Sequence, residues 1–164
     1  MFEKDTSKLE KELGFRFENS LLLIEALTHK SFSSSEENNQ RLEFLGDALL
    51  NTVVAHYLFE YFPKANEGKL TQMRAQIVSR DQLNRIGKNL NLMQWMQTDH
   101  KQSYFGEDVH GNLLESLLGA LFIDKGYEKS KVFVLDKIIF EYIDIESLDG
   151  QVLSYKSAVI EWAQ

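Results

Sequence analysis

Three polar side chains occupy one stripe of a single helical segment: Gln40, Glu43 and Asp47. At 100° per residue, spacings of three and seven place them on one face. Further along the segment the same stripe is apolar, consisting of Leu50, Val54 and Leu58. Because a helix that is apolar all round is buried, we expect these acids to lie inside the protein, where carboxylates need partners.

A second segment, residues 111–124, carries Glu115 with Asn112 three residues before it. This segment is apolar on nearly every side, and the face of Glu115 continues as Gly119 and Phe122. An unpaired buried carboxylate is costly, so the economical interpretation is that both segments direct their acids at one shared cation. Acids without Cys or His partners form an all-oxygen site, which suits Mg²⁺, or Mn²⁺ in its place, better than zinc.

Simpler explanations exist for the same residues. Acids in a first helical turn are favoured by the helix dipole by about 0.3–1 kcal/mol, although this does not explain two acids in register with a buried face. Gly46 and Gly119 disfavour a helix interior by about 1 kcal/mol each. They predict close approach of two backbones beside Asp47 and Glu115, and plain helix packing would explain them equally well.

The elements that position these residues are all predicted to be helical, because long segments have a 3.6-residue apolar period and the chain has one proline. Gly14 ends the first helix, Asn19 or Ser20 caps the second, and Pro63 ends the long central one. The second helix is expected to turn Leu21 toward the core. The expected helices are 1–13, a segment from 19 or 20, 39–62, a pattern from 66 that continues through 78, a short helix over 83–90, 111–124 and 127–145, with a loop over 97–110.

Composition limits the class of protein. With 164 residues and 43% apolar content, the chain can bury one ordinary core. It has no apolar run long enough for a membrane span, no secretory signal at its start and no cysteine, so we expect a cytoplasmic protein. The net charge of −7 alone points away from nucleic acids. Acids neutralised by bound cations, or a basic partner domain, would weaken that objection.

Residues 40–48, Gln-Arg-Leu-Glu-Phe-Leu-Gly-Asp-Ala, closely resemble the ribonuclease III signature, which reads Glu-Arg-Leu-Glu-Phe-Leu-Gly-Asp-Ala/Ser. Three further blocks resemble the same family, at 26–32, 66–75 and 111–124. The resemblance implies the all-α ribonuclease III endonuclease fold, in a homodimer that hydrolyses double-stranded RNA, such as ribosomal RNA precursors, to 5′-phosphate ends and short 3′ overhangs.

The resemblance also implies roles for individual residues. Glu43, Asp47 and Glu115 would hold the metal, and Asn112 stands at a further ligand position. Asp47 and Glu115 would be the catalytic pair. Glu67 and Gln40 would be auxiliary, with Glu67 approaching the site across the dimer.

Gln40 and Asn112 depart from the family pattern, because each replaces a carboxylate with its neutral amide. An amide oxygen still ligates Mg²⁺, but each exchange removes one negative charge. We therefore expect an active nuclease with weakened metal affinity. The alternative is a degenerate domain that binds structured RNA, or scaffolds a ribonucleoprotein, without cleaving it.

Three regions are expected along the chain: an endonuclease domain over 1–145, a linker over 146–153, and 154–164. The last stretch, Ser-Tyr-Lys-Ser-Ala-Val-Ile-Glu-Trp-Ala-Gln, resembles the first helix of a double-stranded-RNA-binding domain, which would then be truncated. A terminal helix that packs on the first domain is the other interpretation.

Overall fold

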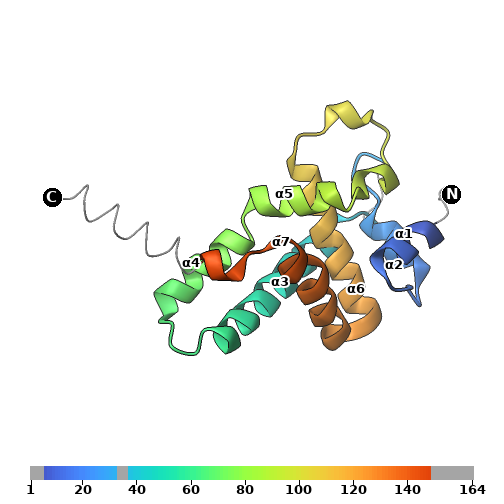
Figure 1. The fold of residues 1–164 in the computed structure, drawn as a ribbon. Helices are drawn as coiled ribbons and strands as arrows, with labels where there is room; N and C mark the ends of the chain where they lie inside the picture. Colours follow the sequence, from blue (N-terminus) through green and yellow to red (C-terminus); the bar gives the residue numbers. More distant parts are fainter. Residues whose placement is uncertain (1–5, 33–36, 149–164) are drawn as a thin grey trace.

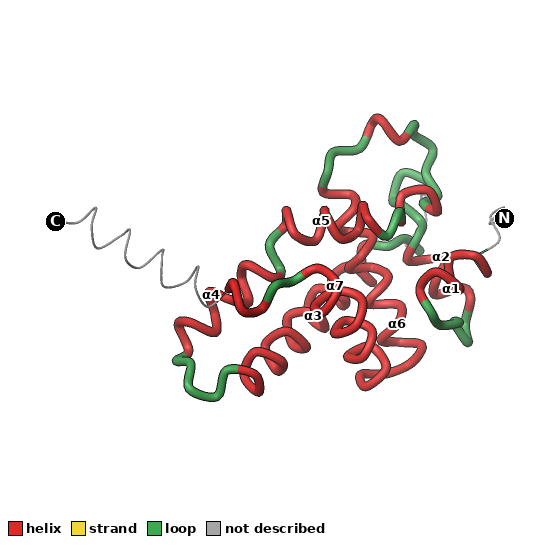
Figure 2. Tube along the Cα trace, in the orientation of Figure 1, coloured by secondary structure: helices red, strands yellow, loops and turns green. Residues whose placement is uncertain are grey.

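A computed structural model describes residues 6–32 and 37–148 (Figure 1). Within these ranges every regular element is helical (Figure 2). Thr28 and Gln97 form an isolated β-bridge. The all-α prediction is therefore confirmed. The helices are α1 (Ser7–Leu13), α2 (Ser20–Ala26), α3 (Gln40–Tyr61), α4 (Glu67–Ile77), α5 (Arg80–Asn89), α6 (Asp108–Val134), a π-helical turn (Leu135–Ile139) and α7 (Phe140–Tyr142), with 3₁₀ turns at Leu92–Trp95 and Gln102–Tyr104.

Helices α3 and α6 form the centre of the fold, and α2 and α5 pack against α6 (Figure 1). The two central helices touch through their backbones. A Cβ atom on Gly46 of α3 would overlap the backbone carbonyl of Glu115, and one on Gly119 of α6 would overlap that of Leu42. The prediction that both glycines mark a close approach is confirmed. The acid-bearing parts of α3 and α6 are consequently held side by side.

The predicted helix ends are largely confirmed. Gly14 has φ 83° and its N–H donates to the Glu10 carbonyl, which closes α1. The Asn19 side chain accepts from the Leu21 N–H and caps α2. Phe62, before the proline, caps the end of α3. Ser79 bends the chain between α4 and α5 by accepting from the Gln82 N–H.

Two segments differ from their prediction. The helix expected to begin at residue 111 begins at Asp108, so the expected loop over 97–110 is shorter and contains a 3₁₀ turn. The expected helices 111–124 and 127–145 are joined at Gly126, where φ is 77° and ψ is −179°. Glycine adopts this conformation readily, so the chain changes direction there without a connecting loop.

The core contains the apolar faces of α1, α3, α5 and α6, but Leu21 of α2 is 69% exposed, so its predicted core position is wrong. Leu27, another residue predicted to face the core, is fully buried, and so is Leu23 four residues before it. Ile145 and Leu148 are buried, so packing continues through the last described residue. The domain boundaries at 145 and 153 stay predictions, and 154–164 lies outside the described residues. No helix in the described ranges is both long and apolar enough to cross a membrane.

Candidate active site

The helix face that carries Gln40, Glu43 and Asp47 is open to solvent at these polar residues. The same face is buried further along the helix, where its residues are apolar. Leu50, Val54 and Leu58 are fully buried, whereas Glu43 is half-buried and Gln40 and Asp47 are exposed. The expectation that the whole stripe is buried is therefore wrong. Further along α3 this face is covered by other helices, but the described part of the chain leaves the same face of the first turns open to solvent.

Glu115 of α6 is only 4% exposed, as its apolar surroundings predict. Burial raises the pKa of Glu115 to about 7, and the nearby carboxylates of Asp47 and Glu43 raise it too, while Arg80 opposes the shift. Burial also raises the pKa of Glu43, against the lowering effects of Arg80 and Lys30. The carboxylates of α3 and α6 thus interact, and negative charge is concentrated where the two helices meet.

Arg80, the first residue of α5, lies within this group of acids. Its Nη1 donates to the Asn112 Oδ1 at 2.6 Å and lies 3.6 Å from the Glu115 Oε2. Sequence reasoning missed this residue. One signal was available, because a cation in the first turn of a helix is disfavoured by the helix dipole and so calls for a nearby anion.

Helix α5 is fixed firmly enough to place Arg80. A Cβ atom on Gly87 would overlap the backbone of His110, so α5 and the start of α6 are in direct backbone contact. Asn84 is buried and joins the two helices. Its Nδ2 donates to the Asp108 Oδ1 at 3.1 Å, and its Oδ1 accepts from the Gly111 N–H at 3.0 Å. The register between Arg80 and the acids therefore rests on backbone packing.

One acid of the cluster, Glu43, lines a cavity of about 330 Å³. The described lining also includes Gln40, Asn112, His29, Lys30 and Phe105, but not Asp47 or Glu115. The His29 Nδ1 accepts from the Ser31 N–H at 3.1 Å, and its ring packs edge-on against Phe105. These contacts support a structural role for His29. Lys30 is the cation of this lining.

The oxygen donors suit Mg²⁺ chemically, since carboxylates and an amide oxygen surround one negative region whose charge a cation would relieve. Glu115 supports this most directly, because it is buried and the nearby carboxylates of Asp47 and Glu43 add to the rise that burial causes in its pKa. In the described ranges, however, no group of three or more His, Asp or Glu side chains gathers closely enough to hold an ion. Arg80 instead contacts Asn112 and faces Glu115.

Glu67 lies apart from the other predicted site residues. As the first residue of α4 it accepts from the Thr71 hydroxyl at 3.0 Å, and it lines a cavity with Ala55 and Phe59 of α3. Position 55 is eight residues beyond Asp47, or about 12 Å along the helix. The structure does not bring Glu67 to Glu115 within one chain.

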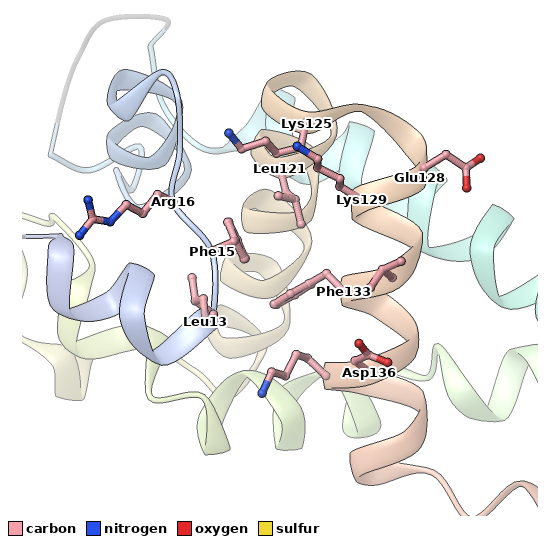
Figure 3. A pocket seen from close by; sticks show the side chains of 12 residues that line it. Leu13, Phe15, Arg16, Leu121, Lys125, Glu128, Lys129, Phe133 and Asp136 are labelled. Atoms are coloured by element: carbon pink, nitrogen blue, oxygen red, sulfur yellow. The ribbon is translucent and has the colours of Figure 1, made fainter.

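A larger cavity, of about 620 Å³, lies between the segment after α1 and the second half of α6 (Figure 3). Phe15 and Phe133 point into it and pack edge to face at 5.3 Å between ring centroids. Charged side chains, including Arg16 and Lys129, surround this apolar floor. The cavity contains none of the interacting acids, so we place the candidate site at the smaller cavity.

Comparison with known proteins identifies relatives over most of the chain. The profile of the family described as ribonuclease-III-like matches residues 19–142. The chain is 46% identical over 163 residues to ribonuclease 3 of Flavobacterium psychrophilum, covering 96% of this chain and 66% of that protein. It is 44% identical over 161 residues to ribonuclease 3 of Zunongwangia profunda, covering 95% of this chain and 66% of that protein. The chain thus spans slightly less than two thirds of their length.

A solved structure has the same architecture. The nuclease domain of ribonuclease III from Campylobacter jejuni, described as having structural flexibility in a region involved in dimer formation, superimposes with a TM-score of 0.79 at 37% identity. The match covers 84% of this chain and 99% of that one.

Proposed function

The chain belongs to the ribonuclease III family, and we propose that it carries the nuclease activity of a metal-dependent endoribonuclease acting on double-stranded RNA. It would hydrolyse phosphodiester bonds to leave 5′-phosphate ends and short 3′ overhangs, with ribosomal RNA precursors as one class of substrate. The absence of cysteine suits a reducing compartment, and we place the activity in the cytoplasm.

The observation that carries this proposal is the buried carboxylate of Glu115, which has a raised pKa beside Asp47 and Glu43. A structural acid would be expected to be neutralised by donors. Among the described residues, the charged neighbours of Glu115 are the acids Glu43 and Asp47 and the cation Arg80. Asp47 is exposed, so this group of acids is open to solvent. A buried acid with a strongly perturbed pKa, next to further acids, is typical of functional sites.

Each residue has a proposed role. Glu43, Asp47 and Glu115 hold Mg²⁺, for which Mn²⁺ can substitute, and Asn112 contributes its amide oxygen. When bound, the ion would stabilise charge on the phosphodiester and lower the pKa of an attacking water. Asp47 and Glu115 are proposed as the catalytic pair because they stand at the positions of the ribonuclease III sequence blocks that the resemblance assigns to this role. Lys30 of the cavity lining offers an ammonium group to an RNA phosphate.

Gln40 and Asn112 are proposed to weaken metal binding without abolishing it, because three carboxylates remain. Calorimetric titration with MgCl₂ tests this. Asp47→Asn should weaken Mg²⁺ binding by about tenfold or more, since it removes a charged ligand. Binding that is unchanged in this variant would refute the assignment of the metal to this site.

We propose that the chain acts as a homodimer in which Glu67 of one subunit approaches the acids of the other. Phe44 supports a contact surface on α3, because it is 79% exposed beside Glu43 and an apolar side chain of that size gains by being covered. Light scattering should give a monomer for Phe44→Ser. Phe140→Ser is the matched control, because Phe140 is 61% exposed and lies on α7. A dimer that persists in the first variant would place the interface elsewhere.

Cleavage of a long, perfectly paired RNA tests the function. The wild-type chain, Glu115→Gln and the control Glu128→Gln should be compared with and without Mg²⁺. Glu128 is an exposed acid of the same helix, outside the cluster. We expect metal-dependent cuts from the wild type and the control but not from Glu115→Gln. A folded dimer that binds the duplex and never cuts it would instead favour the non-cleaving alternative.

A further inference from the structure

We propose that Arg80 is an internal counter-cation of the acid cluster, and that it competes with the divalent metal for Glu115 and Asn112. The inference rests on the proposed function, because it assumes that the metal binds to these acids. The metal affinity of the acid cluster is then regulated by a residue of the same chain. Arg80 acts on metal binding through its neighbours and is therefore a positioning residue.

The contacts support competition directly. The Nη1 of Arg80 donates at 2.6 Å to the Asn112 Oδ1, the atom with which Asn112 would ligate a metal. The same Nη1 lies 3.6 Å from the Glu115 Oε2. A guanidinium and a hard divalent cation both seek carboxylate and amide oxygens. One group must withdraw from these oxygens when the other approaches.

The location of Arg80 in its helix supports the same role. It is the first residue of α5, where exposed N–H groups make a positive charge unfavourable. The acids of α3 and α6 offset that cost, since Arg80 interacts favourably with both Glu43 and Glu115. Its side chain is 49% exposed, whereas that of Glu115 is 5% exposed. The arginine can therefore move toward solvent, and Glu115 cannot.

Two consequences of opposite sign follow. Without metal, Arg80 compensates the buried charge of Glu115, so its removal should destabilise the fold. With metal, Arg80 repels the ion and engages one of its ligands, so its removal should strengthen metal binding. An arginine that only maintained the shape of the site would lower both stability and metal affinity when removed.

Calorimetric titration of the full chain with MgCl₂ tests the second consequence. Arg80→Met keeps the length of the side chain and removes its charge, and it should tighten Mg²⁺ binding about tenfold. Arg80→Lys keeps the positive charge but loses the planar guanidinium group. Its Mg²⁺ affinity should lie between those of the wild type and Arg80→Met. Arg85→Met is the matched control, because Arg85 of α5 donates to the Tyr142 carbonyl at 3.0 Å, away from the acids. It should change Mg²⁺ affinity by less than about twofold.

Thermal unfolding in EDTA tests the first consequence through a cycle of Arg80→Met, Glu115→Gln and the double variant. The Tm should fall in Arg80→Met and should fall less when Glu115 is already neutral. Unchanged or weaker Mg²⁺ binding by Arg80→Met, or an equal loss of Tm in both backgrounds, would overturn the proposal. If neither the wild type nor Arg80→Met binds Mg²⁺, the proposed metal site fails and the competition fails with it.

Discussion

Two acids of α6 with little exposed side-chain surface lie nine residues apart and have opposite surroundings, although Asp124 as a residue is only partly buried. The side chain of Asp124 is 2% exposed and that of Glu115 is 5% exposed. Asp124 accepts at 2.8 Å from the backbone N–H groups of Glu18 and Asn19, and Lys125 lies 3.2 Å away. Burial raises the pKa of Asp124, but these donors outweigh it and hold the pKa below its ordinary value.

Among the described residues, the cation that faces Glu115 is Arg80, whose Nη1 lies 3.6 Å from the Glu115 Oε2. Burial raises the pKa of Glu115 to about 7, Asp47 and Glu43 add to the rise, and Arg80 compensates only in part. Similar side-chain exposure of two carboxylates therefore does not imply an equal role. Asp124 attaches the start of α2 to α6 and contributes stability, whereas Glu115 offers a carboxylate that a cation would stabilise, at a cost to the metal-free fold.

The sharpest contrast is expected in activity. Changing each acid to its amide gives matched variants, Glu115→Gln and Asp124→Asn, on the same helix. The first should lower the rate of metal-dependent RNA cleavage on the order of 10³-fold, comparable to loss of a group that stabilises transition-state charge. The second should keep most of the activity per folded molecule. Initial cleavage rates on paired RNA measure both effects, and circular dichroism confirms that each variant is folded. Equal loss of activity in the two variants would contradict the prediction.

Stability should respond in the reverse order. Asp124→Ala removes the acceptor of two N–H groups and should lower the free energy of unfolding by about 3 kcal/mol. Glu115→Gln removes a poorly compensated charge and should leave that free energy unchanged or raise it by about 1 kcal/mol without metal. Urea unfolding in EDTA measures both values. A greater loss in Glu115→Gln would mean that Arg80 neutralises Glu115 completely.

The pH dependence should separate the two acids as well. A raised pKa means that folding favours protonated Glu115, so this stabilisation is present at low pH and is lost as the pH rises through about 7. Between about pH 5 and about pH 8, metal-free wild type should lose on the order of 2 kcal/mol relative to Glu115→Gln. Asp124, with its lowered pKa, contributes stability that is lost as the pH falls. Parallel stability curves for wild type and Glu115→Gln would contradict this.

The smallest effect is expected from adding charge. Asn112→Asp places a carboxylate beside Glu115 and should tighten Mg²⁺ binding about threefold, because Arg80 pairs with the new charge and offsets part of the gain. Asn19→Asp adds the same charge next to Asp124, where no metal is proposed, and should leave Mg²⁺ binding unchanged. Calorimetry on both variants checks the difference, and equal tightening would indicate a nonspecific effect of net charge.

Sequence patterns predicted the burial of Glu115 because every face of its helix is apolar, so any orientation of that helix buries it. The same patterns wrongly predicted that Asp47 is buried. Periodicity shows which residues share a helix face, but it does not show whether another element covers that face. The first turns of α3 have the same period as the rest of the helix and remain open.

Arg80 could not be found in this way, since its contact with Asn112 joins residues 32 positions apart. Only the packing of α5 on the backbone of α6 brings them together. Gly46 and Gly119 could be identified in advance, because a glycine inside a helix has an energetic cost that calls for a reason.

The contact at Gly46 and Gly119 has a consequence for how the chain tolerates change. Between these positions α3 and α6 meet through main-chain atoms, whose dimensions are the same whatever side chains occupy the rest of the interior. Enlarging or shrinking a distant leucine can alter stability, yet it leaves the spacing of the two acidic helices at this point set by van der Waals contact between main-chain atoms. Substitutions elsewhere in the core therefore leave the distance between the two acidic helices unchanged, and the rest of the interior can vary.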